Sequence, residues 1–219
     1  MAIKCVMFDF GNVLVHFDTP RFYAFLQKHK RSSLKPEEMF TGAGSAAMID
    51  YDLGKVDDLE YYERTKDLFK LEDTTFEEFF DILGDVMNPD PKMLNLKLAL
   101  RSKGLQLVLI SNINRFHLNC ASLKYPEFII GFDYQALSCS MGVRKPDPEM
   151  WIRPLDFLGL KPEECLFVDD YKVNVRAFRE LGGLGYHYSV NDHSFCPNGK
   201  LKQEREKLFS TCRNLGLIS

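Results

Sequence analysis

Apolar residues occur along this chain in two arrangements. Short unbroken runs at residues 3–8, 106–110 and 165–168 predict strands that are buried on both faces, as in parallel sheets. Two more strands are expected at residues 129–134 and near Tyr186. Longer stretches between the runs carry apolar residues at helical spacing. Alternating strands and helices indicate an α/β fold with a mostly parallel sheet and right-handed connections.

The helices are expected in two groups. Between the first strand and residue 89 the pattern is helical only, and polar or proline residues mark four helix starts, at Thr19-Pro20, Pro36-Glu37-Glu38, Asp57 and Thr74-Thr75. Four helices without an intervening strand predict a bundle inserted after the first strand. Beyond Pro89-Asp90-Pro91, helices are expected at residues 92–103, 149–158, 173–181 and 200–212.

Polar residues stand where each of the three apolar runs ends. Asp9 follows the first run, Ser111 and Asn112 follow the second, and Asp169 and Asp170 follow the third. Because parallel strands end at one edge of the sheet, where α/β proteins bind ligands, these side chains are expected to lie together. Carboxylates there would act as a nucleophile or as metal ligands. Each segment also has an ordinary interpretation, a turn after Asp9 and a helix cap for the acidic pair.

A lysine adds to this set, because Lys145 lies in a loop before an expected helix. The order strand-Asp9, strand-Ser111, loop-Lys145 and strand-Asp169-Asp170 resembles the four motifs of the haloacid dehalogenase (HAD) superfamily of hydrolases. The resemblance covers essentially the whole chain. Within the superfamily, residues 111–115, 125–127 and 141–146 look most like the bacterial α-D-glucose-1-phosphate phosphatases and the phosphatase domain of soluble epoxide hydrolases.

This resemblance implies two domains and a metal-dependent activity. A Rossmann-like core of residues 1–15 and 89–219 would carry a helical (C1-type) cap of residues 16–88 over the strand ends. The implied activity is a Mg²⁺-dependent phosphatase that hydrolyses a small phosphorylated metabolite. Its cofactor would be Mg²⁺, a hard cation that prefers oxygen ligands.

The resemblance also assigns roles to individual residues. Asp9 would be the nucleophile that forms a phosphoaspartate, and Lys145 would balance negative charge. Ser111 and the backbone N–H of Asn112 would bind phosphoryl oxygens. The metal ligands would be Asp9, Asp170 and the backbone carbonyl of Gly11, and the supporting residues Asp169 and Asn174.

Position 11 departs from the pattern of the superfamily. Most HAD phosphatases have a second aspartate there, which protonates the leaving oxygen, whereas this chain has Gly11. General acid catalysis is worth about 10² to 10⁴ in rate. The glucose-1-phosphatase group shares the glycine, and an anomeric phosphate needs less acid help, which favours a glycosyl 1-phosphate as substrate. His16 is a hypothetical replacement donor, since histidine titrates near neutrality.

Two other functions stay open. A 2-haloacid dehalogenase uses the same nucleophile without a metal, but the Asp169-Asp170 pair argues against it. A catalytically silent protein that binds sugar phosphates is the second alternative, because a fold alone does not establish activity. In the cap, Asp50, Tyr51 and Lys55 are candidates for substrate contact, with a solvated loop as the ordinary interpretation.

Composition narrows the class of protein. With 219 residues, 45% of them hydrophobic, the chain can bury one large core and a small accessory module. The net charge of −3 and scattered Lys and Arg residues argue against nucleic acid as a partner. No leader and no apolar run of about 20 residues are found, so a cytoplasmic protein without a membrane partner is expected. A monomer or weak homodimer is the expected oligomeric state.

The six cysteines form no CxxC pair and lack metal-ligand spacing to the histidines, which argues against zinc and favours free thiols. A Cys196–Cys212 pairing stays open.

Overall fold

A five-stranded parallel sheet forms the centre of the chain in the computed structural model, which describes residues 2–40, 42–189 and 198–219. The strand order is β5-β4-β1-β6-β7, and every neighbouring pair is parallel. The strand bounds are β1 Cys5–Phe8, β4 Gln106–Ser111, β5 Tyr134–Leu137, β6 Cys165–Asp169 and β7 Leu184–His187. The predicted α/β fold with a Rossmann-like sheet is confirmed. β1 is central, so its end lies between the ends of β4 and β6.

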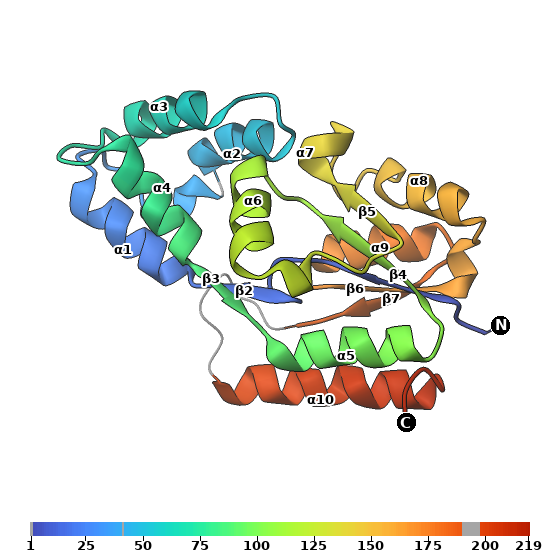
Figure 1. Cartoon of the computed structure of the whole chain (residues 1–219). Helices are drawn as coiled ribbons and strands as arrows, with labels where there is room; N and C mark the ends of the chain where they lie inside the picture. The colour runs from blue at the N-terminus through green and yellow to red at the C-terminus, as the bar shows by residue number, and fades with distance from the viewer. Residues whose placement is uncertain (1, 41, 190–197) are drawn as a thin grey trace.

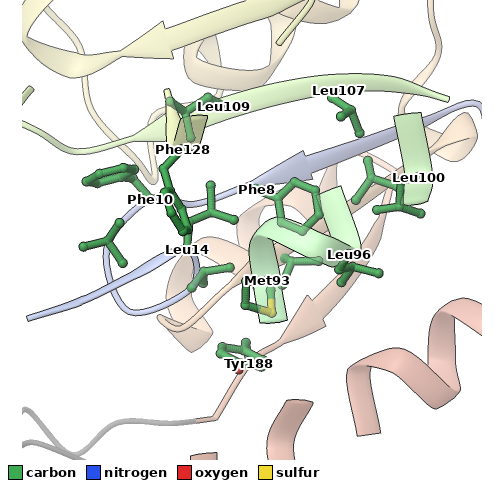
Figure 2. Close-up of a cluster of buried hydrophobic side chains, with 14 of the residues drawn as sticks. Phe8, Phe10, Leu14, Met93, Leu96, Leu100, Leu107, Leu109, Phe128 and Tyr188 are labelled. Atoms are coloured by element: carbon green, nitrogen blue, oxygen red, sulfur yellow. The ribbon is translucent and has the colours of Figure 1, made fainter. Parts of the chain in front are cut away.

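Alternate residues of the central strands pack on opposite faces of the sheet. Phe8 belongs to a cluster with α5 (Pro91–Ser102) and α10 (Asn198–Asn214), which lie on the same side of the sheet (Figure 1). Figure 2 shows Phe8 beside the α5 side chains Met93 and Leu96, and Leu109 beside Phe128. Met7 belongs to the opposite cluster with α8 (Glu149–Leu158) and α9 (Lys172–Glu180). Burial on both faces explains the unbroken apolar runs.

Four helices between β1 and residue 86 have a core of their own. They are α1 Thr19–His29, α2 Ser45–Asp52, α3 Asp58–Phe69 and α4 Phe76–Asp85, and they lie together beside the sheet (Figure 1). Their shared core is aromatic; the ring centroids of Phe22 and Phe79 are 5.6 Å apart. Asp18, Asp57 and Thr75 cap three of the helices by accepting hydrogen bonds from backbone N–H groups. The predicted starts of α1, α3 and α4 are confirmed.

The second predicted helix is wrong in type and incomplete. Residues Pro36–Met39 form a short 3₁₀ helix, and the α-helix that follows, α2, was not predicted. Two three-residue strands were also missed: β2 Val15–Phe17 pairs antiparallel with β3 Met87–Pro89 and links the four helices to the sheet. Three residues are too few to show a strand period in the sequence. The division into core and cap domains stays a prediction.

The strand predicted at residues 129–134 begins at Tyr134 instead, because a 3₁₀ helix at Pro126–Phe128 and a left-handed turn at Gly131 (φ 77°) come first. The remaining short helices are a 3₁₀ turn at Gly42–Gly44, α6 Arg115–Lys124, α7 Ser138–Met141 and a 3₁₀ turn at Pro162–Glu164. Cys196 lies outside the described residues, so the Cys196–Cys212 pairing stays a prediction. In the described ranges, no helix has both the length and the apolar character needed to cross a bilayer.

Candidate active site

Three polar side chains meet where the central strands end. Asp9 directly follows β1, Ser111 is the last residue of β4, and Asp169 is the last residue of β6. The N–H of Asp9 donates to the carbonyl of Val168 (2.9 Å), so Asp9 is held against the end of β6. Asn12 has a left-handed backbone (φ 56°), which asparagine tolerates, and turns the chain away from the sheet.

Lys145 joins the ends of all three strands. Its Nζ donates to Asp9 Oδ1 (2.8 Å), to Asp169 Oδ2 (2.7 Å) and to the carbonyl of Ile110 (2.9 Å). These three bonds use all the donors of an ammonium group. Burial alone would lower the pKa of Lys145, but the adjacent carboxylates of Asp169 and Asp9 outweigh it, and the pKa is raised. Lys145 is therefore charged and fixed in position.

The side chain of Asn112 positions this lysine. Its Oδ1 accepts from the backbone N–H of Lys145 (2.8 Å), and its Nδ2 donates to the carbonyl of the same residue (3.1 Å). From the sequence, only the backbone N–H of Asn112 was predicted to bind a phosphoryl oxygen. The contact of its side chain with Lys145 was not predicted. Ser111 is 2% exposed, lines the cavity, and its hydroxyl makes no hydrogen bond within the described ranges. That hydroxyl is available to a bound molecule.

An acidic cluster lies next to the lysine. Asp9, Asp169 and Asp170 each have an oxygen within 4.8 Å of the others. Asp169 is fully engaged, because its oxygens accept from Lys145, from the N–H of Tyr171 (2.7 Å) and from Asn174 Nδ2 (3.1 and 3.2 Å). Asp170 Oδ2 accepts from the side chain of Asn12 (3.2 Å). Of these three carboxylates, Asp9 and Asp170 line the cavity together with Asn174, whereas Asp169 does not.

The charges of this cluster fit a divalent cation. Burial raises the pKa of Asp9, Lys145 opposes that shift, and the two neighbouring carboxylates raise it further. Three buried carboxyl groups thus lie against a single ammonium group, and a bound cation would offset the negative charge that Lys145 leaves unbalanced. Carboxylate oxygens are the ligands that Mg²⁺ prefers. The residues present therefore suit Mg²⁺, which Asp9, Asp170 and the carbonyl of Gly11 would hold.

A cavity of about 540 Å³ opens from these strand ends toward the four helices. At the strand ends the cavity is lined by polar residues: Asp9, Ser111, Lys145 and Asp170. Toward the helices its lining is mostly apolar: Phe17, Phe22, Phe40, Met48, Leu83 and Val86. Pockets with apolar walls and a few convergent polar groups are typical ligand sites. The phosphate-binding residues predicted from the sequence are brought together at the polar end.

One acidic residue that lines the cavity on the side of the helices was not predicted from the sequence. Asp52 ends α2, is 8% exposed and lines the cavity. Its Oδ1 accepts from Asn114 Nδ2 (3.3 Å), and Arg144 lies 3.9 Å from its Oδ2. Its backbone carbonyl accepts from the hydroxyl of Ser138 (2.6 Å). Burial raises the pKa of Asp52 to about 6, although Arg144 and Asn114 act in the opposite direction.

A buried histidine fixes the orientation of Asn114. His117 Nε2 lies 3.0 Å from the carbonyl of Leu83 and must donate to it, so Nδ1 is the acceptor for Asn114 Nδ2 (3.1 Å). Burial lowers the pKa of His117 to about 4, and the Leu83 carbonyl only partly offsets this, so the ring is neutral at pH 7. The amide of Asn114 therefore directs its N–H groups toward His117 and Asp52.

Several residues proposed from the sequence lie elsewhere. Asp50 accepts from Arg64 (3.1 Å) and Tyr51 stacks on Tyr61 with ring centroids 4.1 Å apart; neither they nor Lys55 line the cavity. The expected substrate contacts of this turn are wrong, because Asp50 and Tyr51 pair with α3 and Lys55 pairs with Asp50. Asp52, the residue after Tyr51, lines the cavity instead.

His16, the hypothetical proton donor, does not line the cavity either. It lies on β2, and its Nε2 is 3.2 Å from Asp90 Oδ2, which Arg205 of α10 also contacts (2.8 Å to Oδ1). The ring thus pairs with the start of α5 rather than with the strand ends.

Known proteins resemble this chain over most of its length. A D-ribitol-5-phosphate phosphatase of Bacteroides thetaiotaomicron is 30% identical, over 82% of this chain and 89% of that protein. Acyl-CoA dehydrogenase family member 10 of Mus musculus is 29% identical over 83% of this chain, which spans only 17% of that longer protein.

A crystal structure of a HAD family enzyme from Bacteroides thetaiotaomicron, in complex with magnesium and inorganic phosphate, shares the fold. Its TM-score is 0.73 at 22% identity, over 87% of this chain and 96% of that one. The profile of the haloacid dehalogenase-like hydrolases matches residues 3–182. The chain therefore belongs to the haloacid dehalogenase-like hydrolase family, and named phosphatases are among its relatives.

Proposed function

We propose that this chain is a Mg²⁺-dependent phosphatase that hydrolyses a small phosphate monoester through a phosphoaspartate on Asp9. The observation that carries the proposal is the meeting of Asp9, Lys145 and Asp170 at one end of a cavity. Asp9 Oδ1 is held by Lys145 and by the N–H of Phe10 (2.7 Å), whereas no donor within the described ranges reaches Oδ2. One oxygen is thus fixed and the other is free to react.

The chain's own residues would carry the two displacements. Asp9 attacks phosphorus and the ester oxygen leaves; water then attacks the phosphoaspartate, and Asp9 and phosphate are released. Ser111 Oγ and the N–H of Asn112 donate to phosphoryl oxygens, and Lys145 offsets their charge. Bound Mg²⁺ would supply charge neutralisation at the phosphoryl oxygens. The magnesium and phosphate named for the related crystal structure support this choice of cofactor.

The proposed substrate is a sugar or polyol phosphate. A glycosyl 1-phosphate stays the expectation from position 11, and the related D-ribitol-5-phosphate phosphatase supports a polyol phosphate. The apolar walls formed by Phe22, Phe40 and Met48 suit the carbon faces of either compound or an aryl group. A dehalogenase would need no cation, which the acidic cluster here is suited to hold.

The test is a phosphate-release screen over glucose 1-phosphate, ribitol 5-phosphate and 4-nitrophenyl phosphate, with Mg²⁺ or with EDTA. Activity should require Mg²⁺ and fall at least about 10³-fold in Asp9→Asn, since the nucleophile is lost. Asp18→Asn is the matched control, because Asp18 only caps α1. Mg²⁺ should also raise the melting temperature of the wild type more than that of Asp9→Asn. Undiminished activity in Asp9→Asn would refute the proposal.

A further inference from the structure

The cavity is lined by a third carboxyl group besides Asp9 and Asp170, and the proposed chemistry still lacks a proton donor for the leaving oxygen. With Gly11 at the position of the usual acid, no side chain there can protonate the leaving oxygen. The backbone of Gly11 lies beside Phe17, whose ring would be 3.4 Å from an added Cβ. The proton donor must therefore come from another wall of the cavity. Asp52 lines the same cavity and, unlike Asp9 and Asp170, lies outside the acidic cluster at the strand ends.

Asp52 and Asp9 line the same cavity and are contacted by neighbouring residues of the same loops. Lys145 contacts Asp9, and the residue before it, Arg144, faces Asp52. On the other side, Ser111 ends β4, and Asn114, three residues later, donates to Asp52. The loop that holds Lys145 against Asp9 thus also carries Arg144 beside Asp52, and the loop after β4 carries both Ser111 and Asn114. The ester group of a phosphate bound at Asp9 would extend into the cavity that Asp52 also lines.

The two oxygens of Asp52 differ in a way that suits an acid. Oδ1 accepts from Asn114, whereas no hydrogen bond within the described ranges reaches Oδ2, whose nearest cation, Arg144, is 3.9 Å away. A proton on the carboxyl group would therefore sit on Oδ2. Arg144 Nε is itself buried without a hydrogen-bond partner. Asp52 Oδ2 and Arg144 Nε are both suited to polar contacts with a bound leaving group.

We propose that Asp52 is the general acid and base of this phosphatase and acts on the leaving-group oxygen in place of the absent aspartate at position 11. The inference rests on the proposed function. In the first displacement the Oδ2 proton moves to the ester oxygen as the P–O bond breaks and the Asp9–P bond forms. In the second, the Asp52 carboxylate takes a proton from the attacking water, and Asp9 leaves as a carboxylate.

The residues around Asp52 allow its carboxyl group to donate a proton in the first step and to accept one in the second. Burial keeps its carboxyl partly protonated in weakly acidic solution, and Arg144 favours the ionised form needed afterwards. The titratable groups that pack around it are Arg144 before α8, His117 on α6 through Asn114, Cys139 on α7, and Tyr51 and Tyr61 on α2 and α3. His117 is neutral and both of its nitrogens are engaged, so it does not compete as the donor.

The test compares leaving groups in the first turnover, so that only cleavage of the P–O bond is measured. Asp52→Asn should slow ribitol 5-phosphate, whose alkoxide needs a proton, by about 10² to 10⁴. The same variant should slow release of 4-nitrophenolate, which leaves without a proton, by less than about 10-fold. The wild-type decline in rate for the alkyl ester as pH rises past about 6 should also disappear.

Asp50→Asn is the matched control, because Asp50 lies two residues earlier on α2, pairs with Arg64 and Lys55, and does not line the cavity. It should leave both rates unchanged. Equal losses on the two esters in Asp52→Asn, or no loss on ribitol 5-phosphate, would overturn the role of Asp52. Absence of phosphate release from both esters by the wild type would instead remove the proposed function.

Discussion

The polar groups at the two ends of the cavity differ in how completely they are hydrogen-bonded. At the strand ends, Lys145 uses all three donors and Asp169 accepts from Lys145, Tyr171 and Asn174, all over short distances. At the helical end, Asp52 has one side-chain hydrogen bond of 3.3 Å and an ion pair of 3.9 Å. Rigid strands of one sheet support the first set, whereas the second joins an inserted helix to loops.

This difference indicates which property each end controls. A fixed, fully bonded set of charges suits the phosphoryl group, which is common to all phosphate esters. A more loosely bonded end with apolar walls suits the part that differs between esters. Changes at the strand ends should therefore affect every substrate, while changes at the helical end should separate one substrate from another. Four variants test this contrast.

Replacing Lys145 should give the largest effect. Lys145→Met leaves Asp9 and Asp169 as adjacent buried carboxylates without a cation, which should lower the free energy of unfolding by about 3–5 kcal/mol. Turnover of every ester should fall by at least about 10²-fold. Urea unfolding and initial rates measure the two losses. Mg²⁺ should stabilise this variant more than the wild type, since the ion would replace part of the missing charge.

Lys97→Met is the matched control for this prediction. Lys97 is also buried, but its Nζ donates to the carbonyls of Glu127 (2.8 Å) and Ile130 and lies over the ring of Phe132. Its replacement should cost stability without changing the turnover of folded protein. An equal loss of turnover in both variants would mean that stability, not charge at the strand ends, limits activity.

A smaller effect is expected in the pH dependence of Asp52→Asn. The pKa of Asp52 is raised from 3.8 to about 6, so the folded protein holds a proton there that the unfolded chain releases. This contribution to stability is complete below pH 4 and is lost as pH rises through 6. Asparagine does not titrate. The stability of Asp52→Asn relative to wild type should therefore increase by about 2 kcal/mol between pH 4 and 7.

Urea unfolding at pH 4, 5.5 and 7 measures this change, with the partly exposed Asp50→Asn as the control. His117 acts with the opposite sign in both proteins, because its lowered pKa removes stability as pH falls from 6.5 toward 4. The wild type should thus be less sensitive to acid than Asp52→Asn. Parallel curves for the two proteins would show that the carboxyl of Asp52 is not buried as described.

The strand end of the site was predictable from the sequence, whereas the helical end was not. Asp9, Ser111 and Asp169 follow apolar runs that are buried on both faces, and such runs indicate parallel strands whose ends converge. Asp52 belongs to a helix without an apolar stripe, and its partner Asn114 is 62 residues away. Which side chain of α2 turns inward depends on how the helix docks, and no local pattern encodes that.

The docking itself is tested by Ser138→Ala. The Ser138 hydroxyl donates to the carbonyl of Asp52 (2.6 Å) and accepts from the N–H of Ile113 (2.9 Å), so its loss leaves two buried backbone groups unpaired. Stability should fall by about 2 kcal/mol, and ribitol 5-phosphate should lose more rate than 4-nitrophenyl phosphate. Ser140→Ala is the control, since Ser140 is exposed in the same short helix. Equal losses for both esters would contradict the contrast.

The smallest effect is expected for His16→Gln. Asp90 keeps Arg205 (2.8 and 3.1 Å) and the N–H of Lys92 (2.9 Å) after the ring is removed, so the cost should stay below about 1 kcal/mol. The pH profile of turnover should not change, because His16 lies outside the cavity that Asp9 and Asp52 share. Rates from pH 5 to 8 test this. Loss of a titration step in His16→Gln, with the step retained in Asp52→Asn, would transfer the proton-donor role to the histidine and leave the helical end without a part in the chemistry.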